Sequence, residues 1–176
     1  MMAVAAATAP APLSAQDTVW NRYTLEGLGG VFIRAEAATT CESVGVTAAN
    51  AQTKAALQLL QTEVGLLTEE DMLSHPGLPE LRITIDCAKG DNGLSDTLAY
   101  SVGLRVQQAA QMIRDTQVTL AETVTWYSTA VGVVDSEDAE ETLEGVLTDQ
   151  LDSFAPVSYT HLRAHETRHD LVCRLL

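Results

Sequence analysis

Basic residues are scarce in this sequence. Its 176 residues include 10 Lys and Arg against 24 Asp and Glu, which gives a formal net charge of −14. Nucleic-acid binding requires clustered Lys and Arg that displace counterions from phosphates, and anionic membrane surfaces likewise attract basic segments. The scarcity therefore argues against nucleic acids and anionic membrane surfaces as partners.

Long apolar runs are also missing. No stretch reaches the ~18 apolar residues that mark a membrane-spanning helix. We therefore predict that the chain has no transmembrane segment.

The last 20 residues, 157–176, do not read as natural protein. Residues 157–167 resemble one reading frame of the transposase-type adapter used in short-read sequencing libraries, whose preceding bases complete a codon for Pro156. A sample index accounts for the next codons, and the flow-cell sequence that follows translates to residues 170–176. The resemblance covers the whole segment, so we expect a non-native, adapter-derived tail that must be set aside before fold reasoning.

Setting the tail aside changes the candidate chemistry. His161, His165 and His169 are spaced by four residues, which would place three imidazoles on one helix face and imitate a metal site. Because they belong to the tail, we predict no metal site. The remaining chain has seven basic and 22 acidic residues, one histidine and two cysteines.

Residues 1–15 are typical of the end of a secretory signal peptide. They form a short Ala-rich apolar stretch, and Leu13-Ser-Ala15 supplies an acceptable pair of residues for cleavage before Gln16. The basic region that usually opens such a peptide is missing, and the alternative is an Ala/Pro-rich leader on a cytosolic protein. We expect an exported protein, periplasmic or extracellular, with a single domain over residues 16–156.

Hydrophobic periodicity predicts an α+β fold. Alternating apolar residues favour strands at 31–37, 81–87 and 100–106, a Thr-rich run favours another at 118–134, and a short strand is expected at 66–67. Two main helices are expected at 47–64 and 136–154, with a helical turn from Thr68 and a hairpin turn at 89–93. The two apolar helix stripes are Ala49, Ala56, Leu57, Leu60 and Val64, followed by Gly65 as a C′ residue, and Ala139, Leu143, Val146, Leu147, Leu151 and Phe154.

The order β-α-β-β-β-β-α with one-sided helices predicts a two-layer sandwich, in which a mainly antiparallel sheet has two main helices on one face. Residues 17–155, with the opening Asp17-Thr-Val-Trp20 and Gly30-Val-Phe-Ile33, loosely resemble small exported bacterial proteins from environmental sequencing. That resemblance carries no activity to transfer.

The natural cysteines, Cys41 and Cys87, form a candidate disulfide, since an even pair in an exported protein invites one. They lie at or after the ends of two strands that a helical crossover would make parallel. Against this, Cys87 is in register with Ile83 and Ile85, where a free thiol behaves as a small hydrophobic residue. We expect free thiols.

No catalytic motif is found. His75 lies in a Pro/Gly loop without a partner at ligand spacing, so we expect a solvated residue. The acidic residues at 69–71 and 135–141 lack the spacing of calcium loops and favour helix N-terminal charge instead. We therefore predict no catalytic residue, cofactor or metal.

The interpretation that remains is an exported, non-catalytic binding or assembly module of the cell envelope, whose partner would be another envelope protein. Trp126 and Tyr127 face opposite sides of a strand, so one is expected in the core and one on a partner surface. The alternative is a glycosidase-like hydrolase with two carboxylates on the open sheet face. Glu122 is its candidate acid, although a β-bulge that turns Glu122 outward is the simpler explanation.

Overall fold

The computed structural model describes residues 19–62, 64–90 and 96–154. The predicted leader (1–15) and the predicted tail (157–176) both lie outside this part of the chain, as does most of the hairpin turn expected at 89–93.

Five strands form one mixed sheet in the order β2-β1-β3-β4-β5. β1 (Gly30–Ala37) is parallel to both of its neighbours, β2 (Gly65–Leu66) and β3 (Glu80–Lys89). β3, β4 (Thr97–Gln111) and β5 (Thr119–Asp135) form an antiparallel meander. The helical connection after β1 explains the parallel pairs, because a parallel neighbour requires a crossover rather than a tight turn.

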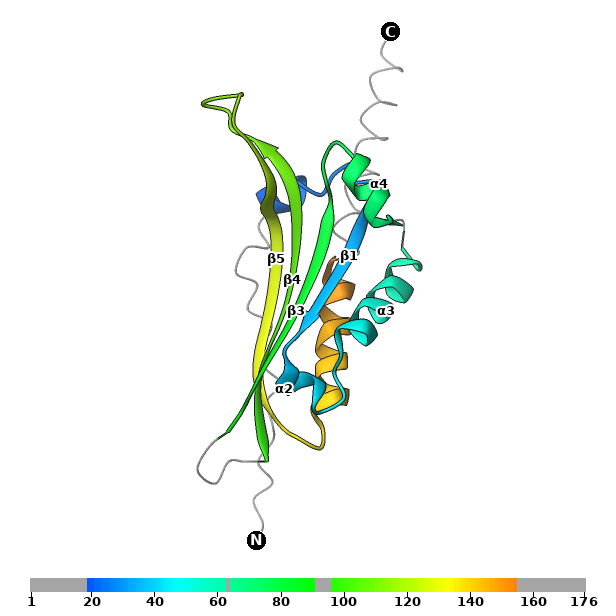
Figure 1. Ribbon diagram of the computed structural model, residues 1–176, viewed down its shortest axis with the longest axis vertical. Coiled ribbons are helices and arrows are strands. Elements are labelled where there is room, and N and C mark those ends of the chain that lie inside the picture. The colour runs from blue at the N-terminus through cyan, green and yellow to red at the C-terminus, as the bar shows by residue number, and fades with distance from the viewer. Residues whose placement is uncertain (1–18, 63, 91–95, 155–176) are drawn as a thin grey trace, which may run out of the picture.

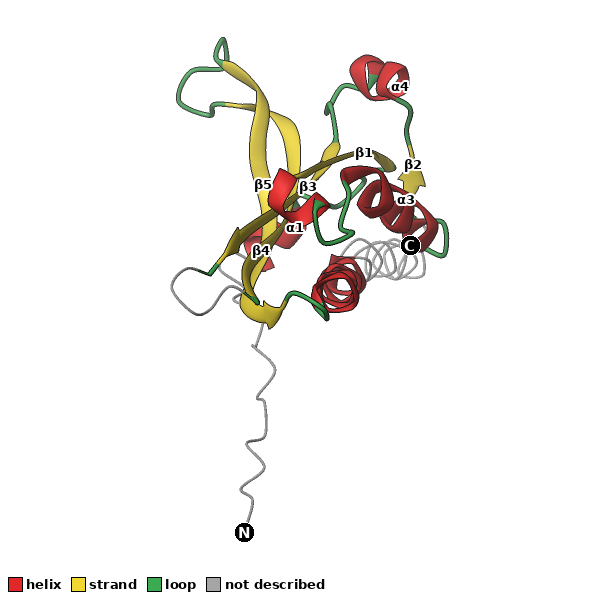
Figure 2. Ribbon diagram, turned by 60° about the horizontal axis from the view of Figure 1, so that its bottom comes forward, coloured by secondary structure: helices red, strands yellow, loops and turns green. Residues whose placement is uncertain are grey.

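The helices gather on one face of this sheet (Figures 1 and 2). Two of them form most of that layer: α3 (Ala48–Leu59) and a C-terminal helix at residues 139–154. Shorter helices lie at the ends of the sheet: α1 (Val19–Tyr23), α2 (Thr39–Glu42) and α4 (Glu69–Ser74). The predicted α+β class is confirmed, with a mixed sheet and one open face.

The core lies between the sheet and the helix layer. The strands β1, β3 and β4 place their alternating apolar residues there, as in β3, where Leu81, Ile83 and Ile85 are buried. β5 differs, because Leu120 and Val124 are exposed. Trp126 of β5 contacts Phe154 of the C-terminal helix, with ring centroids 5.2 Å apart. The helix contributes the predicted stripe at three- and four-residue spacing, in which all residues but the half-buried Val146 are buried: Ala139, Leu143, Leu147, Leu151 and Phe154.

The prediction for the first main helix was wrong about its buried face. α3 packs on the sheet through Ala51, Ala55 and Leu59, whereas Leu57 and Leu60 are 59% and 66% exposed. Small residues at i and i+4 let the α3 backbone approach the sheet closely, and the C-terminal helix then occupies the space beside it. The more hydrophobic stripe was therefore not the one that tertiary packing selected.

The helix starts follow their local signals. Thr47 caps α3 by accepting a hydrogen bond from the Asn50 N–H. Thr68 and Asp71 form a reciprocal capping box at the start of α4. Gly65, expected as a C′ residue, instead begins β2, where its backbone closely approaches that of Gly30. The expected strand at 66–67 is thus present, beginning one residue earlier.

No helix in the described part of the chain is long and apolar enough to cross a membrane.

Candidate functional site

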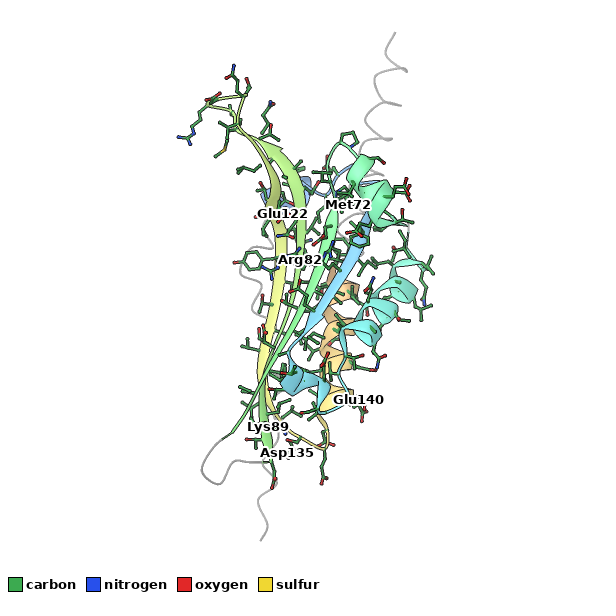
Figure 3. All side chains as sticks on the ribbon, in the orientation of Figure 1. Met72, Arg82, Lys89, Glu122, Asp135 and Glu140 are labelled. Atoms are coloured by element: carbon green, nitrogen blue, oxygen red, sulfur yellow. A yellow bond between two sulfur atoms is a disulfide. The ribbon has the colours of Figure 1, made fainter. Side chains whose placement is uncertain are left out.

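The open face of the sheet carries a row of three arginines across neighbouring strands. Arg34 of β1 pairs in register with Arg82 of β3, and Arg82 pairs with Arg105 of β4. The row continues to Tyr127 on β5, which is the register partner of Arg105. We call these residues, Arg34, Arg82 and Arg105, the arginine row; Figure 3 labels Arg82 in the middle of the sheet.

Two of the three charges are compensated by a carboxylate. Glu80 is 8% exposed and accepts hydrogen bonds from Arg34 Nε at 3.1 Å and from Arg82 Nε at 2.7 Å. Arg34 also donates to Glu69 of α4 at 3.1 Å, and its guanidinium lies 5.2 Å from the centroid of the Phe32 ring. The hydrogen bond to Glu80, followed by that to Glu69, raises the pKa of Arg34 above its ordinary value.

Arg105 differs from its two neighbours. It is half-buried, and no carboxylate among the described residues forms an ion pair with it. The row thus holds three positive charges against the two carboxylates Glu80 and Glu69. Local positive charge is unexpected in a chain whose net charge is −14.

A shallow hollow of about 400 Å³ lies beside Arg105 on the open face. Its floor is at Gly103, whose register partners are Thr84 and Thr129; a Cβ atom there would lie 2.9 Å from Thr84 Oγ1. The missing side chain therefore makes the depression. The lining combines hydroxyl groups, one guanidinium and a few apolar surfaces: Thr84, Ser101, Gly103, Leu104, Arg105, Val124, Tyr127 and Thr129.

Gln107 adds an unused acceptor near the row. It pairs in register with Glu80 and is 8% exposed, and its Oε1 atom has no hydrogen-bond partner in the described part of the chain. A buried oxygen without a donor costs free energy, which a ligand that supplies a donor would recover.

The tyrosine and tryptophan of β5 lie on opposite faces of the sheet, as predicted. Trp126 is 1% exposed in the core, and Tyr127 lines the hollow. The predicted bulge in β5 is also confirmed, since the β4–β5 register shifts twice, between Val106 and Gln107 and between Gln108 and Ala110. As a result Glu122 is exposed near the N-terminal end of β5 (Figure 3) and lies outside the hollow.

Carboxylates do not line the hollow. Glu80 is held between two arginines, while Glu36 and Asp86, the other acids on this face of β1 and β3, are exposed. The facing pair of partly buried carboxylates that a glycosidase-like site requires is therefore not formed by the hollow.

The expectation of free thiols was wrong. Cys41 of α2 and Cys87 of β3 form a disulfide, with their Cα atoms 5.3 Å apart. The crossover after β1 makes β1 and β3 parallel, with Ala37 opposite Ile85, and so brings both cysteines to the same end of the sheet. Alternation along β3 correctly placed Cys87 on the inner face, but that face is where Cys41 packs.

His75 is not simply solvated. It follows α4 directly, is half-buried, and its Nδ1 accepts a hydrogen bond from the Gly77 N–H at 3.1 Å. No group of His, Cys, Asp or Glu in residues 19–62, 64–90 and 96–154 is arranged to hold a metal ion.

The arginine row is the feature that sequence reasoning missed. In each of the three strands the arginine alternates with buried apolar residues, and that alternation is the only signal that the sequence carries. A comparison with protein-family models, curated proteins and solved structures found no match for this chain.

Proposed function

We propose that this protein is an exported, non-catalytic binding module that holds an oxyanion of a polar ligand at Arg105 on its open sheet face. The observation that carries the proposal is the arginine row, which gathers three of the seven basic residues of positions 1–156 and leaves Arg105 without a carboxylate partner among the described residues.

The chemistry of the hollow suits a carboxylate, sulfate or phosphate group. A guanidinium binds planar or tetrahedral oxyanions through paired N–H donors, and charge-assisted hydrogen bonds are about twice as strong as neutral ones. The hydroxyls of Thr84, Ser101 and Thr129 would bind the polar groups that surround the anion, and Tyr127 would line one side of the site. A volume of about 400 Å³ lies in the usual range of small-molecule sites.

Export is supported by two independent features. The residues before Gln16 are typical of a cleaved leader. The disulfide between Cys41 and Cys87 is of a kind that persists in oxidising compartments and is rare in the cytosol. Mass spectrometry of periplasmic material from a bacterium that expresses the complete gene should find a chain beginning near Gln16, and uncleaved cytosolic protein would contradict the proposal.

The binding proposal is tested by titrating the full chain with sulfate and, separately, with glucuronate, and following backbone amide shifts by NMR. We expect saturable shifts at Thr84, Arg105 and Thr129. Arg105→Gln should weaken binding roughly 10- to 100-fold, because a hydrogen bond to a charged group contributes about 1.5–3 kcal/mol.

Arg114→Gln is the matched control, since Arg114 is exposed in the β4–β5 turn and removing it changes the net charge by the same amount. An equal loss in both variants would mean only non-specific attraction. Failure of both anions to perturb the three residues would overturn the proposal.

A further inference from the structure

The two edges of the sheet differ in strand length and in how far a helix covers them. On one side β2 is only two residues long, and the edge of β1 beyond it is covered by α3, where Gln52 Nε2 donates to the Ile33 carbonyl at 3.1 Å. On the other side β5 is 17 residues long and is the last strand of the sheet. Long uncovered edge strands are rare, because their unpaired N–H and C=O groups bind other chains.

The β5 edge also lacks the features that usually prevent such pairing. β5 contains no Lys and no Pro, and residues 126–134 carry no charged side chain. Val131 and Val133 are 46% and 71% exposed. The α1 region contacts this edge at the Thr125 carbonyl, which accepts a hydrogen bond from Asn21 Nδ2 at 3.0 Å. Residues 126–134 of β5 follow that contact in the sequence.

A small groove lies beside this edge, between β5 and the C-terminal helix. One side of the helix faces α3, where Glu144 pairs with Lys54 and Asp152 accepts from Gln58. The other side faces β5 and encloses a space of about 90 Å³. The groove is lined by residues of both elements and of β4: Tyr100, Ser128, Ala130, Val146, Asp149, Gln150 and Ser153.

Two residues of the groove, Asp149 and Gln150, offer acceptor oxygens that lack a donor in the part of the chain that the structure describes. Asp149 is exposed at the groove and forms no ion pair within the described residues. Gln150 is 3% exposed; its Nε2 donates to the Val102 carbonyl at 2.9 Å, and its Oε1 is unpartnered in the same part of the chain.

We propose that the β5 edge and this groove bind an extended segment of another protein as an added strand, with a Lys or Arg side chain of that segment directed to Asp149. Main-chain hydrogen bonds to the edge would supply affinity, and the groove would select the side chain that points toward the helix. Side chains alternate along a strand, so the neighbours of the basic residue would lie over Val131 and Val133 on the open face.

Charge decides between this occupant and a second copy of the chain. Each copy carries a formal charge of −14, and a second copy would bring no basic residue on its own residues 126–134 to meet Asp149. A basic, β-branched segment complements both the acidic groove and the uncharged edge.

The test is to select peptides from a displayed random library on the immobilised full chain, and to synthesise the enriched sequences. We expect one Lys or Arg flanked on alternate positions by Val, Ile or Thr. Such peptides should slow hydrogen exchange at amides of residues 127–133, which distinguishes strand addition from binding in the groove alone. Binding at the arginine row would instead perturb Arg105, so the two proposals fail separately.

Asp149→Lys should weaken these peptides by about tenfold or more, because it turns attraction into repulsion at an exposed position that the fold does not require. Glu141→Lys, the same charge reversal on an exposed position of the same helix outside the groove, should leave affinity within about twofold. Enrichment without a basic residue, equal loss in both variants, or unchanged exchange in β5 would overturn the proposal. A dimer that Val133→Lys dissociates would assign the edge to a second copy and also overturn it.

Discussion

The disulfide between Cys41 and Cys87 should be a major source of stability. It joins residues 46 positions apart and ties α2 to β3 at one end of the sheet. Closing a loop of that length removes chain entropy from the unfolded state, which corresponds to about 4 kcal/mol at 25 °C in the loop-closure model. That is a large share of the roughly 5–15 kcal/mol by which a domain is usually stable.

The measurement is thermal unfolding of the oxidised and reduced chain in a Cys173→Ala background, so that no third thiol can exchange. We expect reduction to lower the midpoint by roughly 10–15 °C, from the usual few degrees per kcal/mol for a domain of this size. The reduced chain keeps both sulfur atoms, and it therefore separates the cross-link from the packing lost when the fully buried Cys41 is replaced by Ala.

Two results would refute this reasoning. Alkylation before and after reduction would give the same mass if both thiols were already free in the native chain. A midpoint that does not change on reduction would mean that the cross-link constrains little of the unfolded ensemble.

Three further predictions concern the helices and the tail. Leu147→Ala should destabilise the protein by about 2–5 kcal/mol in chemical denaturation, because Leu147 is 2% exposed beneath the sheet. Glu141→Ala, on the exposed side of the helix, should change the free energy of unfolding little. Equal losses of stability in the two variants would contradict the packing of the helix on the sheet. Thr68 donates its hydroxyl and then its backbone N–H to Asp71, which lowers the pKa of Asp71 below its ordinary 3.8. The stability from this capping box is therefore present at neutral pH and is lost as the pH falls through the lowered pKa of Asp71. The difference in thermal midpoint between wild type and Asp71→Ala should therefore narrow below pH 3.8. A difference that stays constant with pH would contradict this prediction. Deleting residues 157–176 should shift the midpoint by no more than the few degrees that correspond to ~1 kcal/mol, since a segment with the predicted adapter origin would have no selected packing partner. A larger drop would show that the tail is part of the fold.

The sequence by itself determined most of the local structure. Alternation at period two identified β1, β3 and β4, a Thr-rich run identified β5, and the stripe of Leu143, Leu147 and Leu151 identified the C-terminal helix and its buried face. These signals are local, because neighbouring side chains on a strand or helix report which face is buried. The class of fold followed from their order.

The face of α3 was decided by packing. Leu57 and Leu60 made the more hydrophobic stripe, yet Ala51 and Ala55 face the sheet, since the distance between the two layers admits small residues there. The sequence of the helix alone does not determine the distance between the sheet and the helix layer.

The disulfide and the arginine row depended on long-range register. Alternation placed Arg34, Arg82 and Arg105 on outward faces, but only the strand order β1-β3-β4 and the alignment of each pair brought them to one level. The same parallel alignment of β1 and β3 carried Cys41 to Cys87. A shift of two residues in either register would preserve every inward and outward assignment and still separate these groups, because the side-chain period of a strand is two.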